Sequence, residues 1–145
     1  MSPSARAVAL AAALALAPAL AHGAEKAVFT PAADLEWINA GIPGVDTAQV
    51  QGDMKKGASR FYLRYASGFV APVHHHSPDH FATTVTGNLV LIVDGKEHRL
   101  PPGSYFAFTG KAKHAVRGEG AEACGMFIDA RGSGDVVVPK PKGAK

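Results

Sequence analysis

The sequence predicts an all-β domain, built as a sandwich or a small barrel. From about residue 60 onward, short runs of alternating apolar and polar residues are separated by turns that contain glycine or proline. No helical periodicity persists over ten residues after the first 24. The 16 glycines and 10 prolines among 145 residues indicate many tight turns.

Turn signals mark off the expected strands in order. A looser strand is expected over 35–38, before Pro43-Gly44, and a clearer one over 60–66, where every second residue is apolar. The run 89–93 ends at Asp94-Gly95, a strong hairpin signal, so its partner should cover 96–100. The remaining expected strands cover residues 81–86, 104–109, 114–117, 121–128 and 136–138. In the strand over 104–109, we expect Tyr105, Phe106 and Phe108 to belong to the core.

Residues 1–24 have the pattern of a secretory signal peptide. Arg6 is the one charged residue before an apolar run over 8–17, which is followed by Pro18 and the small-residue triplet 19–21. Cleavage after Ala21 and cleavage after Gly23 both fit this pattern. The run is too short to span a bilayer, so we expect a periplasmic or secreted protein that is not inserted in the membrane in its mature form.

The mature chain of about 120 residues is long enough for one domain. We expect an N-terminal arm over 25–59, a barrel over 60–138 and a flexible basic tail over 139–145. The arm either lies across the barrel or pairs with a second subunit, and we expect a homodimer formed through it.

The charge balance and the cysteine content exclude one class of partner and one kind of cross-link. Without Arg6, 14 of the 15 basic residues remain against 12 acidic ones, and three of them lie in the last six residues. The folded body is therefore near neutral, and nucleic acid is not an expected partner. A single cysteine, Cys124, excludes an intramolecular disulfide, and we expect it to be a buried, inert thiol.

Histidines concentrate in one short segment. His74, His75, His76 and His80 fall within seven positions, and His114 lies on a later expected strand. On an extended chain, the side chains of His74 and His76 point to one face and that of His75 to the other. Neutral imidazoles that meet at one point can bind zinc, copper, iron or nickel. His98 lies among charged residues, so we expect it at the surface.

The spacing of these histidines resembles that of the cupin superfamily. The first cupin motif, G-x5-H-x-H-x3-E-x6-G, is matched from Gly68 to Gly87, except that His80 replaces the usual glutamate. The second, G-x5-P-x-G followed about ten residues later by histidine, is matched by Gly95, Pro101, Gly103 and His114. Gly118 replaces its terminal asparagine.

The resemblance implies a double-stranded β-helix, or jelly-roll barrel, with one divalent transition metal ion (Fe, Zn, Mn, Ni or Cu). The implied metal ligands are His74, His76 and His114, with His80 in the fourth position. Asp79 is an alternative fourth ligand, although its opposite parity on the strand opposes this. The set is similar to that of all-histidine cupins, such as the acetylacetone-cleaving dioxygenase and the cupin region of some anti-sigma factors.

Two functions follow from this resemblance. One is a metal-dependent dioxygenase that acts on a small diketone, enol or phenolic compound. The other is a closed zinc site in a binding or sensing module that is not an enzyme. The sequence shows no pair of carboxylates at the spacing of a hydrolase dyad, which favours an oxygenase over a hydrolase.

Overall fold

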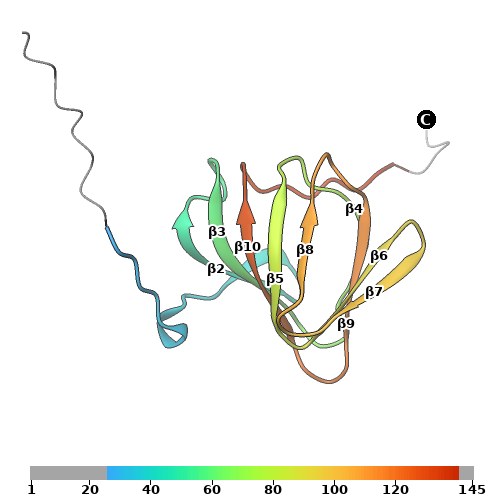
Figure 1. Cartoon of the computed structure of the whole chain (residues 1–145), viewed down its shortest axis with the longest axis horizontal. Helices are drawn as coiled ribbons and strands as arrows, with labels where there is room; N and C mark the ends of the chain where they lie inside the picture. The colour runs from blue at the N-terminus through green and yellow to red at the C-terminus, as the bar shows by residue number, and fades with distance from the viewer. Residues whose placement is uncertain (1–25, 141–145) are drawn as a thin grey trace, which may run out of the picture.

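The computed structural model describes residues 26–140 and consists almost entirely of strands (Figure 1). The expected signal peptide and the last five residues of the expected tail lie outside the described residues. The elements are η1 (Ala32–Asp34), β1 (Ile38–Ile42), β2 (Val45–Gly52), β3 (Ser59–Tyr65), β4 (Val70–His74), β5 (His80–Thr86), β6 (Asn88–Val93), β7 (Lys96–Leu100), β8 (Tyr105–Phe108), β9 (His114–Glu119) and β10 (Cys124–Ala130).

The strands form two antiparallel sheets, which confirms the expected jelly-roll barrel. One sheet has six strands in the order β1-β2-β3-β10-β5-β8, and the other has four in the order β4-β9-β6-β7. Apolar side chains from both sheets meet between them and exclude water, which is the main source of stability in such a barrel. The buried cluster consists of Phe61, Ala82, Leu89, Leu91, Val116, Cys124, Met126, Ile128 and Ala130.

The expected hairpin at Asp94-Gly95 is confirmed. Val93 pairs with Lys96 across a two-residue turn, and Asp94 and Gly95 have φ of 49° and 76°. Positive φ at both central residues defines the turn type that matches the twist of a hairpin.

The prediction that Tyr105, Phe106 and Phe108 all belong to the core is wrong for Tyr105. Its side chain is 65% exposed, whereas Phe106 and Phe108 pack against the core.

The segment before residue 60 contributes more to the barrel than its sequence indicates. Its first strand begins at Ile38 instead of Leu35. A second strand, β2, pairs with β3 from Val45 to Gly52 and buries Val45, Thr47 and Ala48. The sequence pattern missed β2 because its inward residues are mostly small and because a register shift between Gln49 and Gln51 breaks its alternation.

The segment after β10 runs across the end of the barrel instead of forming a strand. We call residues 131–138 the strap. In Figure 1 it leaves β10, passes the ends of β5 and β8, and continues toward β4. The strand expected over 136–138 is reduced to one isolated bridge between Val137 and His75. Within residues 26–140, no helix is long and apolar enough to cross a membrane.

Alanine substitution at two glycines with positive φ should distinguish the cost of backbone strain from the cost of a steric clash. Gly87 and Gly95 have φ of +67° and +76°, but a Cβ at Gly87 would lie 2.5 Å from the Ala123 carbonyl oxygen, whereas nothing lies within 4 Å at Gly95. We expect G95A to lower the free energy of unfolding by about 1 kcal/mol. G87A should cost about 1–3 kcal/mol more, because the β10 backbone must move. Urea unfolding monitored by circular dichroism measures both, and equal losses would contradict the steric conflict.

Candidate metal centre

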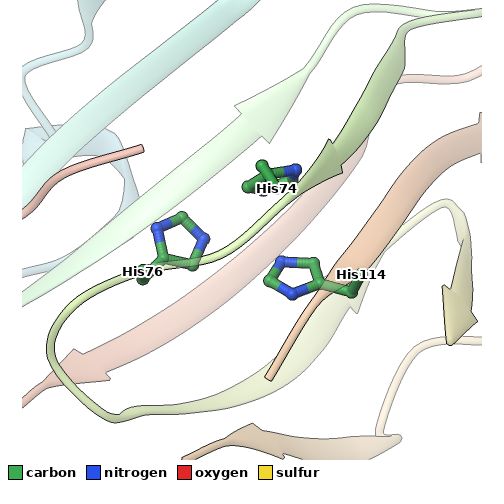
Figure 2. A group of neighbouring side chains, drawn as sticks. All are labelled: His74, His76 and His114. Atoms are coloured by element: carbon green, nitrogen blue, oxygen red, sulfur yellow. The ribbon is translucent and has the colours of Figure 1, made fainter. Parts of the chain in front are cut away.

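Three imidazoles gather inside the barrel, where β4 and β9 meet. Antiparallel pairing places His74 directly opposite His114, and His76 follows two residues after His74. One nitrogen from each ring lies within 4.8 Å of the other two. Figure 2 shows the three rings around a common space, His74 from β4, His114 from the start of β9 and His76 from the loop after β4. The structure thus brings together three of the four histidines that the sequence predicts to converge.

A backbone carbonyl is bonded to Nδ1 of each triad ring and leaves Nε2 free to bind a metal ion. Nδ1 of His74 lies 2.8 Å from the Pro72 carbonyl oxygen, and Nδ1 of His114 lies 3.0 Å from that of Ala112. Nδ1 of His76 is bonded to the Asp135 carbonyl oxygen. A carbonyl can only accept, so each Nδ1 carries the proton and each Nε2 keeps its lone pair. This is the usual arrangement around a metal-binding histidine.

Burial disfavours the protonated forms of His76 and His114. His74 and His114 are 4% and 2% exposed, and loss of water lowers the pKa of His114 to about 4. Burial also lowers the pKa of His76, against the opposing effect of its bond to Asp135. The ring of His114 is stacked on Phe108 with 3.6 Å between centroids, which fixes its plane. Near neutral pH, His76 and His114 therefore need not lose a proton to bind a metal ion.

His80 lies beside the triad but outside the group defined by 4.8 Å. It is 7% exposed, and its ring stacks on that of His76 with centroids 4.3 Å apart. Its Nε2 is buried and has no hydrogen-bond partner among the described residues. Burial lowers the pKa of His80 to about 4. A buried ring nitrogen without a hydrogen-bond partner is costly, so His80 stays the predicted fourth ligand.

The other candidates of the sequence have different places. The Asp79 carboxylate accepts a hydrogen bond from the Gly110 amide at 3.0 Å, and Asp79 does not line the cavity that holds the triad. His75 pairs with Val137 through its backbone and also lies outside the cavity lining. His98 is exposed. Cys124 is fully buried, and its thiol donates to the Asn88 carbonyl at 2.9 Å.

The four histidines line a cavity of about 710 Å³. Most of its wall is apolar, with side chains from both sheets such as Phe61, Leu63, Phe106, Phe108, Leu91 and Met126. The few polar residues of the lining besides histidine include Lys55, Asn39, Thr47 and Tyr65. A concave apolar space with a few convergent polar groups is typical of a small-molecule site.

Asp135 also lines this cavity, and the sequence analysis did not identify it. Its carbonyl oxygen accepts from His76, while its carboxylate accepts from the Ser77 amide at 2.7 Å and from the Ser77 hydroxyl. These bonds lower the pKa of Asp135 against the effect of its partial burial. The run Gly132-Ser133-Gly134-Asp135 indicates a turn, and no local pattern connects it with His76.

The residues present fit a divalent transition metal ion. One nitrogen of each triad ring lies within 4.8 Å of the other two, the Nδ1 atoms are bonded to carbonyls, and a fourth imidazole with an unpartnered nitrogen lies next to them. Imidazole suits zinc, copper, iron and nickel alike, so the ligands do not select one of these metals. The His74, His76 and His114 group can hold one such ion.

The fold and the site define a small jelly-roll barrel with a histidine triad in its interior. The family model described as Cupin domain matches residues 61–129, and many solved cupin structures share the fold. The chain belongs to the cupin superfamily.

Several solved structures are similar to this chain. The polyketide cyclase RemF from Streptomyces resistomycificus has a TM-score of 0.65 and 13% identity, with 81% of this chain and 89% of that one covered. KdgF from Halomonas sp. has a TM-score of 0.60 and 18% identity, with 71% and 94% covered. An RmlC-like cupin from Shewanella frigidimarina has a TM-score of 0.59 and 16% identity, with 71% and 88% covered. At these identities the similarity shows the fold alone. A comparison with curated proteins finds no match.

Alanine substitution of the triad should abolish tight metal binding. We expect H74A, H76A and H114A each to weaken Zn(II) binding by at least about 100-fold, because each removes one of three neighbouring ligands. H98A is the matched control, because it removes an exposed imidazole outside the cavity. Isothermal titration calorimetry measures the affinities, and a triad variant that binds as tightly as H98A would contradict the site.

Proposed function

We propose that the protein is an exported, mononuclear metal-dependent dioxygenase that acts on a small diketone, enol or phenolic compound. The observation that carries this proposal is a set of imidazoles facing one space inside a mostly apolar cavity of about 710 Å³. The proposed ligands are His74, His76 and His114, with His80 as the fourth. A bound Fe(II) ion would supply Lewis acidity and a site for O2.

The neutral ligand set favours an anionic substrate. Imidazoles donate lone pairs without cancelling charge, so an ion held by histidines alone keeps its full positive charge in an apolar surrounding. An enolate or phenolate supplies the missing negative charge at one end and a flat apolar body at the other. Phe106 and Phe108 on the cavity wall suit such a body.

The shortage of free carboxylates opposes hydrolytic chemistry. Asp135 is the one carboxylate side chain in the described lining, and both of its oxygens accept hydrogen bonds from Ser77. A hydrolase of the paired-carboxylate type needs a second acid or base within reach of the substrate. The mostly apolar wall instead suits a reaction with O2.

Export and dimer formation complete the proposal. The pattern of residues 1–24 supports export to the periplasm or beyond. The six-stranded sheet ends at β1, whose five residues are all exposed. An exposed edge strand is a template for pairing with another chain, which supports a homodimer formed through the N-terminal arm.

His80 provides the first test of the proposed ligand set. We expect H80A to weaken Zn(II) binding by about 10- to 100-fold, less than loss of a triad member, because three ligands remain. H80E restores the glutamate of the cupin motif and should recover or exceed wild-type affinity, because a carboxylate offsets part of the charge of the ion. Calorimetric titration of the three proteins decides this, and unchanged affinity in H80A would exclude His80 as a ligand.

Oxygen uptake tests the reaction. The Fe(II)-loaded protein should consume O2 together with acetylacetone or a phenol such as catechol, as followed with an oxygen electrode. The Zn(II)-loaded protein should consume none, because zinc has no redox chemistry. H114A, treated with Fe(II) in the same way, should show no uptake above that of free Fe(II).

The alternative, a closed zinc site in a binding or sensing module, gives opposite results. His80 favours this alternative, because its unpartnered Nε2 belongs to a ring that stacks on His76 and could provide a fourth ligand. Four histidines around zinc would hold the barrel together, so a chelator would unfold the protein. For the oxygenase we expect the circular dichroism spectrum to survive chelation, because the apolar core between the sheets does not include the metal. Unfolding by chelator without any O2 uptake would replace our proposal by this alternative.

A further inference from the structure

We propose that the strap is a working part of the metal site, with Asp135 as a positioning residue that holds His76 in the orientation and tautomer that a metal ion requires. The role rests on the metal centre proposed above. It assigns a task to a segment that lies outside both histidine motifs.

The three triad members are oriented in two different ways. His74 and His114 each donate Nδ1–H to a carbonyl two residues earlier in the same stretch of chain, that of Pro72 and that of Ala112. His76 lies beyond the end of β4, and its partner is the carbonyl of Asp135, 59 residues away in sequence. Two ligands are therefore oriented by carbonyls close to them in sequence, whereas the third depends on a distant segment.

Asp135 forms hydrogen bonds with two neighbouring residues of the loop after β4, His76 and Ser77. Its carbonyl holds the imidazole of His76. Its carboxylate accepts two hydrogen bonds from Ser77, the residue after His76. One oxygen lies 2.7 Å from the Ser77 amide nitrogen, and the other accepts from the Ser77 hydroxyl. The side chain of Asp135 thus fixes the loop backbone against the carbonyl that orients the ring, and loss of the carboxylate should loosen both.

The rest of the strap is fastened on either side of Asp135. Gly134 donates its amide to the Met54 carbonyl at 2.7 Å, and Val137 exchanges two backbone hydrogen bonds with His75 at 2.9 and 3.0 Å. Gly134, Asp135, Val136 and Val138 all line the cavity. The strap therefore forms part of the cavity wall near His76, and its backbone crosses the end of the barrel in Figure 1.

Strap closure and metal binding should be reciprocal. The closed strap favours the orientation of His76 that places its Nε2 beside those of His74 and His114. A metal ion favours the same orientation. By linkage, each stabilises the other, so the closed strap raises metal affinity and the metal reduces opening of the strap.

Substitutions at Asp135 test this role. We expect D135A to weaken Zn(II) binding by about 10- to 100-fold, as typical for loss of a group that orients a ligand. The visible absorption of Co(II)-loaded D135A should shift toward that of H76A, because His76 no longer binds in its normal orientation. D135N should recover part of the affinity, since its amide oxygen still accepts from Ser77.

D46A is the matched control. Asp46 also forms a side-chain ion pair, with Arg64 at 2.9 Å, but lies outside the cavity lining. We expect wild-type metal affinity and a wild-type Co(II) spectrum in D46A. D135A with the affinity and spectrum of D46A would overturn the role of the strap and leave the metal centre intact. Absence of metal binding in the wild type would instead contradict the metal centre itself.

Hydrogen–deuterium exchange of the wild type gives a test that does not depend on the folding of a variant. Zn(II) should slow exchange in peptides that cover the strap, where the amides of Gly134 and Val137 are hydrogen-bonded. Peptides that cover the β6–β7 hairpin, residues 88–100, should exchange equally with and without the metal. Equal exchange of the strap in both states would overturn the proposal.

Discussion

The site depends on the register between β4 and β9. Directly opposed residues of an antiparallel pair project to the same face of the sheet with their Cβ atoms close together. The pairing of His74 with His114 therefore places two imidazoles side by side inside the barrel. A shift of one residue would send one of them to the outer face, and no local adjustment of His76 could replace it.

Placing imidazoles in an apolar interior has a cost, and the structure reduces it in a specific way. Each Nδ1 of the triad has a carbonyl partner, so the polar groups left without partners are those that face the common space. Burial also disfavours the protonated rings, as the pKa of about 4 for His80 and for His114 shows. The carbonyls thus satisfy one nitrogen of each triad ring and leave the other free to bind a metal ion.

The apolar wall and the neutral ligands act together. A charged ion in this surrounding attracts an anion more strongly than it would in water, and the cavity has room for a small organic molecule. The hydrogen-bonded strands of the two sheets form the rigid part of the cavity wall. The strap supplies a part held by a few hydrogen bonds, and such segments open more easily than paired strands.

The sequence by itself determined the fold class, most strands between residues 59 and 130, and the histidines of the site, because alternation, turn residues and motif spacing are local patterns. It missed β2, whose inward residues are small, and it placed Tyr105 in the core although its neighbour Phe106 faces inward. Tertiary structure alone decided which nitrogen of each ring is free and that Asp135 holds His76. That contact joins residues 59 positions apart, and it depends on the path of the strap across the barrel, which no periodicity in the sequence encodes.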